Sequence, residues 1–215
     1  HFNPAGAEMP LDEYKQGDKV VPYKVIAEYK GSDLVGMHYA QLFPWVKPVA
    51  KLGDAIVDAS ADAFRVIPGD YVTTEDGTGI VHIAPTFGAD DAFVAKAAGV
   101  PSLFMVNKKG ETRPMVDFTG KFWTIDELDE NFVKEFVNVE LYSKFAGAYV
   151  KNAYDPQYTV DGRYDEKAAA KAETLDVALC MVMKQGGVAF KIEKHVHNYP
   201  HCWRTDKPVL YYPLN

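Results

Sequence analysis

One stretch of the sequence, GTGIVHIAPTFGADDAF at residues 77–93, gathers side chains that could do chemistry. It carries one histidine, His82, and two adjacent aspartates, Asp90 and Asp91. An imidazole and two carboxylates that converge on one concavity are typical of a polar binding or catalytic site. The pattern predicts such a site, although spacing by itself does not name the substrate.

The elements expected around these residues would bring them together. A tight glycine-flanked turn at 77–79 precedes a short strand at 80–83, which Pro85 ends because proline has no N–H for a ladder. Gly88 then frees the chain before a helix over 91–98. A strand, a bend and a helix N-terminus therefore direct the histidine and the aspartates towards each other, and such junctions often carry function.

Each of these residues also has a purely structural interpretation. Acidic residues at a helix N-terminus are stabilised by the helix dipole and are common as caps. A histidine in a strand is more often a satisfied structural residue than a ligand. Only their combination within one proline–glycine bend favours a site.

Other chemistries have weaker signals. The sequence contains no G-x-S-x-G elbow, no Walker loop and no dinucleotide fingerprint, so covalent catalysis and phosphate cradling are not the first interpretation. A zinc site could be drawn from His195, His197, His201 and Cys202. A structural zinc needs four closed ligands, and no C-x-x-C partner exists, so we favour a solvated polar segment and predict no metal ligand.

The composition is that of an ordinary globular protein. The 215 residues, 47% of them hydrophobic, suit one large domain or two small ones. A net charge of −7 argues against bulk attraction to nucleic acid. The two cysteines make no disulfide framework, so a reducing cytoplasm is expected. No membrane span or signal peptide is visible, and the first and last residues suggest an excised piece of a longer chain.

Periodicity predicts a β-rich barrel or sandwich with peripheral helices. A capping box of Thr124 and Glu127 predicts a helix over about 125–137. The longest helix is expected over 164–185, with Gly186 at its close. Strands are expected at 20–29, at 34–39, within 56–67, at 71–74 paired with 79–84, at 103–106 and at 188–192.

Two patches, GTGIVHIAPTFGADD at 77–91 and HNYPHCWR at 197–204, resemble isoleucyl-tRNA synthetase, specifically its inserted editing domain. The resemblance implies an α+β fold dominated by a β-barrel with peripheral helices. It implies an editing domain over 1–194, with an extra segment at 111–145, and an exit segment over 195–215 that leads back to the synthetic domain. The HIGH and KMSKS signatures are absent, so no cofactor is expected in this chain. ATP and Mg²⁺ would serve the synthetic domain.

The same resemblance implies a function and a role for each site residue. The editing domain hydrolyses valine wrongly esterified to the tRNA for isoleucine. Asp91 matches the aspartate that holds the α-ammonium of the misattached amino acid, and His82 matches the histidine that helps to exclude isoleucine. Asp90, Thr78 and Gly79 would shape the pocket. The expected partners are the tRNA acceptor end and the rest of the synthetase.

Two alternatives and two departures from the family pattern remain. The chain could be a tRNA acceptor-end binding module without hydrolysis, with Lys108, Lys109 and Arg113 as a local phosphate contact. It could also be the editing domain of a valyl or leucyl enzyme. The family's threonine-rich strand of the type TTTPWT is missing here, and Thr205 stands where some members carry a second cysteine.

Overall fold

The computed structural model describes residues 3–15, 17–75, 78–194 and 198–213. By their internal contacts, the residues divide into two compact units. The first unit comprises His1–Ala40 with Phe64–His82, and the second comprises Gln41–Ala63 with Ile83–Asn215. Each unit is considered by itself.

The secondary structure of the described residues mixes short helices and short strands. The α-helices are α1 (Gly31–Leu34), α2 (Ala89–Ala98), α3 (Glu130–Phe136), α4 (Val139–Tyr142), α5 (Glu166–Ala169) and α6 (Leu175–Gln185). The strands are β1 (Val49–Leu52), β2 (Ala55–Asp58), β3 (Phe104–Val106), β4 (Thr112–Pro114), β5 (Thr159–Val160) and β6 (Arg163–Tyr164). The 3₁₀ helices are η1 (Pro4–Ala7), η2 (Leu11–Glu13), η3 (Ser60–Asp62), η4 (Ile125–Glu127), η5 (Asn152–Tyr154) and η6 (Pro156–Tyr158).

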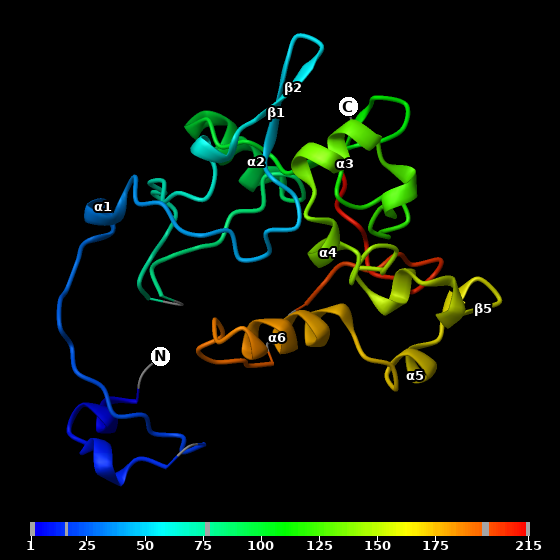
Figure 1. Cartoon of the computed structure of the whole chain (residues 1–215). Coiled ribbons are helices and arrows are strands. Elements are labelled where there is room, and N and C mark those ends of the chain that lie inside the picture. Colours follow the sequence, from blue (N-terminus) through cyan, green and yellow to red (C-terminus); the bar gives the residue numbers. More distant parts are fainter. Residues whose placement is uncertain (1–2, 16, 76–77, 195–197, 214–215) are drawn as a thin grey trace. The chain divides into compact units, whose positions relative to one another are not determined.

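The first unit holds few of these elements. The predicted strand over 20–29 is wrong, because this segment runs as a single extended trace that forms no ladder with another described segment (Figure 1). The apolar side chains of its second half stay exposed, and Ile26 is 91% exposed. The strand expected at 34–39 is also absent: α1 occupies its start, and pairing is limited to an isolated bridge between His38 and Arg65.

Among its described residues, the second unit contains three two-stranded antiparallel sheets: β1–β2, β3–β4 and β5–β6. The strand predicted at 103–106 is confirmed as β3, in which Phe104 pairs with Pro114. Of the strand pair predicted within 56–67, around 63–66, only the start overlaps a strand, because 63–66 forms no strand. The overlapping strand is β2, which pairs back onto β1 in a hairpin that projects from its unit (Figure 1). The mixed helix and strand content is thus confirmed, while the described residues show no closed barrel.

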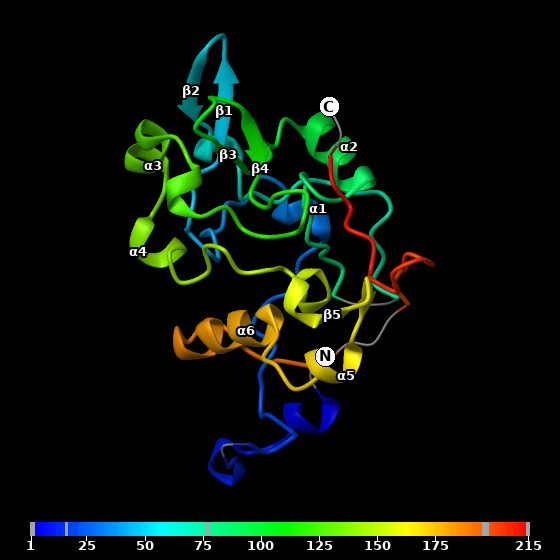
Figure 2. The same ribbon diagram turned by 90° about the vertical axis from the view of Figure 1, so that its right-hand side faces the viewer.

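An aromatic core holds the second unit together. The Trp45 ring stacks on Phe145 at a centroid separation of 4.8 Å, and Phe122 and Tyr142 meet it edge-on. Tyr142 is fully buried and donates its hydroxyl to the Trp123 carbonyl at 2.5 Å. Stacked and edge-on contacts of this kind add to the free energy gained by burying the rings. Figure 2 shows α3 and α4, which supply part of this core, beside the β1–β2 and β3–β4 hairpins.

Much of this core comes from 111–145, the segment that we expected to be an addition to the family fold. Its buried apolar side chains are Val116, Phe122, Leu128, Phe132, Phe136, Tyr142 and Phe145. Whatever its origin, the segment is packed into the second unit and is not a loose surface insertion.

The two long helices predicted from the sequence are both interrupted. The capping box of Thr124 and Glu127 is confirmed, but it starts only η4, and Asp129 then caps α3 separately. The helix expected over 164–185 is divided into α5 and α6, because Thr174 accepts a hydrogen bond from the Val177 N–H and so begins a new helix. The strand expected at 188–192 is not formed.

Candidate functional site

The bend at Ala84 that precedes α2 is closed by its own backbone. The Ala84 carbonyl accepts hydrogen bonds from the N–H of Phe87 at 3.1 Å and of Gly88 at 3.2 Å. Pro85 fits inside this turn because its position requires no donor. The chain therefore reverses in a few residues and enters α2 directly at Ala89.

Asp91 ties the helix back to the bend. It lies in the first turn of α2, and its Oδ2 accepts a hydrogen bond of 2.9 Å from the Ala84 N–H. The side chain is half-buried. Elsewhere in the described part of the chain, no donor reaches Oδ1 and no cation lies within ion-pair distance of either oxygen. The carboxylate is thus fixed by one oxygen and keeps hydrogen-bonding capacity on the other.

The bend is braced from outside by distant parts of the second unit. Thr86 is 9% exposed, and its hydroxyl donates to the Leu103 carbonyl just before β3 at 3.4 Å. The Phe87 ring meets Tyr212 edge-on at a centroid separation of 6.4 Å. The Tyr212 hydroxyl in turn donates to the Val116 carbonyl at 3.1 Å. These contacts limit movement of the peptide that holds Asp91.

Asp90 has a different environment from its neighbour. It lies in the first turn of α2 as predicted, but its side chain is exposed. Its position at the positive end of a helix dipole is sufficient to explain an acidic residue there. The structure therefore brings the two predicted aspartates into one helical turn and fixes only Asp91 against the bend.

The other predicted site residues belong to the first unit. The Thr78 hydroxyl donates to the Ile80 carbonyl at 3.2 Å and accepts from the Ile80 N–H at 3.3 Å, a local turn. Gly79 has φ of 75°, which favours glycine. His82 is exposed. That His82 and Asp91 belong to one site stays a prediction.

The strand predicted at 80–83 is wrong, and the hairpin that it should form with 71–74 has no ladder among the described residues. Ile80 is 63% exposed and Val81 is 52% exposed, so the apolar run that suggested a strand is not buried by any sheet. Part of the expected turn, at 76–77, lies outside the described residues. Periodicity alone could not reveal that the strand lacks a partner.

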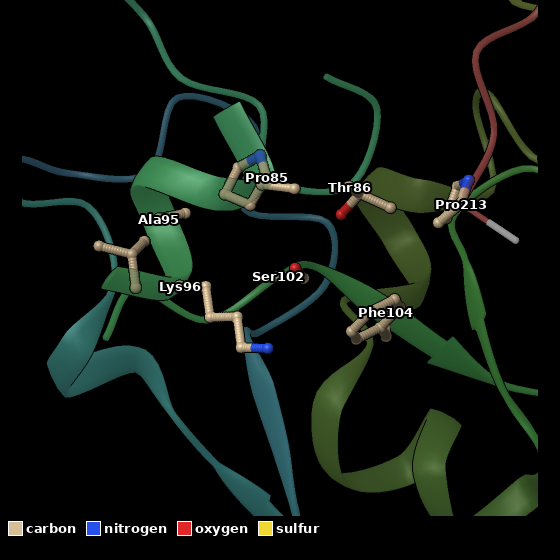
Figure 3. A pocket seen from close by; sticks show the side chains of 9 residues that line it. Pro85, Thr86, Ala95, Lys96, Ser102, Phe104 and Pro213 are labelled. Atoms are coloured by element: carbon tan, nitrogen blue, oxygen red, sulfur yellow. The ribbon is translucent and has the colours of Figure 1, made fainter. Parts of the chain in front are cut away.

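A cavity of about 350 Å³ lies beside the bend and α2. Its walls come from the bend, one face of α2 and the start of β3, with the Lys96 amine extending across it (Figure 3). Its lining residues are Pro85, Thr86, Ala92, Ala95, Lys96, Val100, Ser102, Phe104 and Pro213. Neither predicted aspartate lines it, so the cavity and the Asp91 carboxylate are separate features of the bend.

The segment considered for zinc folds around Cys202. Its carbonyl accepts from the N–H of Thr205 at 3.2 Å and of Asp206 at 2.9 Å. A hydrogen bond from the Thr205 side chain, with support from backbone N–H groups, lowers the pKa of the Cys202 thiol. In the described ranges, no three histidine, cysteine or acidic side chains gather as a metal site would need. His195 and His197 lie outside those ranges.

Two site features were missed from the sequence: the Ala84 N–H as the partner of Asp91, and the space that Gly88 leaves for that contact. The available signal was the spacing G-x-x-D, which puts a glycine at the start of a helix and an acid on its third residue. In a capping box, an acid three residues after the N-cap accepts a hydrogen bond from the backbone N–H of the N-cap residue. Here Asp91 instead accepts from the N–H of Ala84, in the bend that precedes the N-cap.

No helix in the described part of the chain combines the length and apolar character that a bilayer crossing requires.

No protein-family model matches the chain. Individual relatives do. The chain is 72% identical, over all 215 residues, to the isoleucine–tRNA ligase of Bacteroides thetaiotaomicron, of which it covers 18%. It is 53% and 45% identical to those of Porphyromonas gingivalis and Cytophaga hutchinsonii, covering 17% of each.

The chain thus spans less than a fifth of the length of these curated relatives, while every one of its residues falls within the match. The resemblance to isoleucyl-tRNA synthetase inferred from the two patches at 77–91 and 197–204 is therefore confirmed across the whole chain. Identity at this level from end to end means that the chain corresponds to one segment of isoleucine–tRNA ligases.

Proposed function

We propose that this chain is the β-barrel-type editing domain of an isoleucyl-tRNA synthetase, over 1–194, followed by an exit segment over 195–215. It hydrolyses valine wrongly esterified to the tRNA for isoleucine. The observation that carries the proposal is the Asp91 carboxylate, fixed through Oδ2 by the Ala84 N–H and unpaired with any cation in the described part of the chain.

A carboxylate in that state suits the α-ammonium of an aminoacyl ester. The backbone N–H holds one oxygen in place, so the other can accept a charge-assisted hydrogen bond without first giving up a partner. Half-burial reduces competition from water for the same oxygen. Fixing the ammonium also fixes the ester carbonyl, which lies only two bonds from the ammonium nitrogen.

The hydrolysis then needs no protein nucleophile. Water adds to the ester carbonyl carbon, the bond from that carbon to the ribose oxygen breaks, and the oxygen leaves with a proton as the terminal hydroxyl. The products are free valine and uncharged tRNA. Holding ester and water in a reactive geometry can supply much of the rate, because it replaces a bimolecular encounter by a positioned one.

A second, hydrolytic site is needed because an aminoacylation site discriminates poorly between amino acids that differ by one methylene. A missing methylene changes binding in an apolar pocket by only about 1–3 kcal/mol, and isoleucyl-tRNA synthetases are the standard example of this limit. A site that admits valine and excludes isoleucine by size removes the error. We assign that exclusion to the bulk of His82, with Asp90, Thr78 and Gly79 shaping the pocket.

The test is an NMR titration of the chain with two non-hydrolysable adenosine analogues, one valyl and one isoleucyl. We expect valyl-selective shifts at Ala84, Asp91 and His82. Asp91→Ala should abolish them, while Glu135→Ala, which removes an exposed acid on α3, serves as the control and should retain them. His82→Ala should allow the isoleucyl analogue to bind, and unchanged selectivity would mean that His82 does not exclude isoleucine.

Hydrolysis assays separate the proposal from its alternatives. Release of valine from valyl-tRNA for isoleucine, lost in Asp91→Ala, excludes a binding module without hydrolysis. Cleavage of a different mischarged tRNA would indicate a valyl or leucyl editing domain instead.

One of the three cations considered for a phosphate contact in the binding module already has a partner within the chain. The Arg113 guanidinium pairs with Glu111 at 2.9 Å. Lys108 and Lys109 are left as the cations of that patch.

A further inference from the structure

Gly88 is the residue on which the position of the Asp91 carboxylate depends sterically. A Cβ built on Gly88 would lie 2.8 Å from Oδ2, 2.9 Å from Cγ and 3.0 Å from Cβ of Asp91. Real Cβ atoms essentially never approach other heavy atoms below 3.0 Å. The carboxylate of Asp91 therefore occupies the volume that any side chain at Gly88 would need.

This requirement is one of space and not of backbone conformation. Gly88 has φ of −116° and ψ of 129°, which any residue adopts. Glycine is therefore not needed here to relieve backbone strain. Any requirement for glycine here comes from the Asp91 carboxylate, which fills the space of the missing side chain.

Gly88 also leaves α2 without the cap that other helices of the second unit have. The N-cap side chains of α3, α4, α5 and α6 accept a hydrogen bond from the first turn, and they belong to Asp129, Asn138, Asp165 and Thr174. The N-cap of α2 makes no such bond. A conventional cap would stabilise the helix, and the glycine forgoes it.

We propose that Gly88 is a positioning residue: its missing side chain lets the Asp91 carboxylate turn back over the bend and bind the Ala84 N–H. The Asp91 Cβ cannot retreat, because it is attached to the backbone of α2, whose first turn is closed by the 2.8 Å bond from Ala92 N–H to the Gly88 carbonyl. A methyl group at Gly88 must then displace the carboxylate. The catalytic meaning of this displacement rests on the proposed function, whereas the displacement itself does not.

The test compares Gly88→Ala with Gly186→Ala in the same unit. Gly186, at the end of α6, has a helical backbone, and its added Cβ would meet only ordinary contacts, the nearest at 3.4 Å. In Gly88→Ala, we expect the Ala84 amide resonance to move to its position in Asp91→Ala, because both changes break the same hydrogen bond. Gly186→Ala should leave that resonance in place. An unmoved Ala84 amide in Gly88→Ala would overturn the proposal.

A double-variant cycle shows that Gly88 acts through Asp91. Gly88→Ala should weaken binding of the valyl analogue at least tenfold, and adding Gly88→Ala to Asp91→Ala should leave the Ala84 amide resonance where Asp91→Ala alone places it. Two residues that act through one contact are non-additive in this way. A further displacement of the Ala84 amide in the double variant would mean that the methyl group disturbs the site by some other route and would overturn the positioning role.

The two proposals fail differently. If the Ala84 amide moves in Gly88→Ala but wild-type chain binds neither analogue, the positioning contact stands and the editing function fails. Should Gly88→Ala not fold, the Gly88→Ala/Asp91→Ala double variant decides, since the carboxylate that meets the methyl group is then gone. The double variant should melt higher than Gly88→Ala, and an equal or lower melting temperature would place the clash elsewhere.

Discussion

Residues 84–98 and 104–136 both carry carboxylates, but the two regions use them differently. In the second region, the acids are paired with cations nearby: Glu111 accepts from Asn107 and pairs with Arg113, and Glu127 accepts from Thr124 and pairs with Lys121. In the first region, Asp91 accepts a single bond from Ala84 and pairs with no cation in the described part of the chain. The difference separates acids whose charge is balanced within the structure from one whose charge is left for a ligand cation.

The comparison predicts opposite rankings for stability and binding when these acids are removed. Alanine at an acid of the second region should lower the free energy of unfolding and leave binding of the valyl analogue unchanged. Alanine at Asp91, which breaks a single hydrogen bond, should lower the free energy of unfolding less and should abolish binding. The predictions below test that ranking, from the largest expected change in stability to the smallest.

Glu127→Ala should have the largest effect, about 2 kcal/mol of lost unfolding free energy, because the partly buried Thr124 N–H then has no partner. The ion pair of Glu127 with Lys121, at 3.7 Å, adds little. Urea unfolding followed by circular dichroism measures the loss. Glu135→Ala, an exposed acid on α3, is the control and should stay within about 0.5 kcal/mol of wild type. Equal losses in the two variants would contradict the comparison.

Asp129→Ala should lower stability by about 1 kcal/mol, because the Phe132 N–H at the start of α3 loses its acceptor at 2.9 Å. Asp129→Asn keeps an acceptor oxygen and should retain most of that stability. The same unfolding measurement applies. A loss of valyl binding in Asp129→Ala would break the distinction between structural acids and the acid of the site.

Glu111 should give the smallest effect, visible through pH. Hydrogen bonds from Asn107 and then Arg113 lower the pKa of Glu111 below its ordinary value of 4.5. Its contribution to stability is therefore present above pH 4.5 and is lost as the pH falls through the lowered folded-state pKa.

The measurement is the unfolding midpoint of wild type and Glu111→Gln across the acid range. The advantage of wild type over the variant should be full at pH 7 and should disappear in acid as the carboxylate of the folded state is protonated. A difference that does not change with pH would mean that the charge of Glu111 makes no net contribution.

The sequence predicted the local features of the site and fold well. Helix signals around Asp91, the capping box at Thr124 and the strand at 103–106 rest on contacts between near neighbours, which local patterns encode. The two missed interruptions at Asp129 and Thr174 were also encoded locally. Each residue is an ordinary N-cap within a stretch whose apolar periodicity predicted one continuous helix.

What the sequence could not give was the partner of each strand. The apolar alternation at 20–29 and the run at 80–83 both predicted strands, yet a strand is stable only beside another one. In the site, the type of residue at Asp91 was readable, whereas its bond to Ala84 depends on the path of the bend. That path is fixed by contacts with Leu103 and Tyr212, far away in sequence.

The bond between Tyr212 and Val116 spans 96 residues of sequence. During synthesis, which proceeds from the N-terminus, the bend that carries Asp91 is complete long before Tyr212 leaves the ribosome. Closing so long a loop is slow and entropically costly, so this brace should form late in folding. In a nascent chain, the bend beside Asp91 would therefore lack the Tyr212 brace and would be held by the bonds of Asp91 to Ala84 and of Thr86 to Leu103.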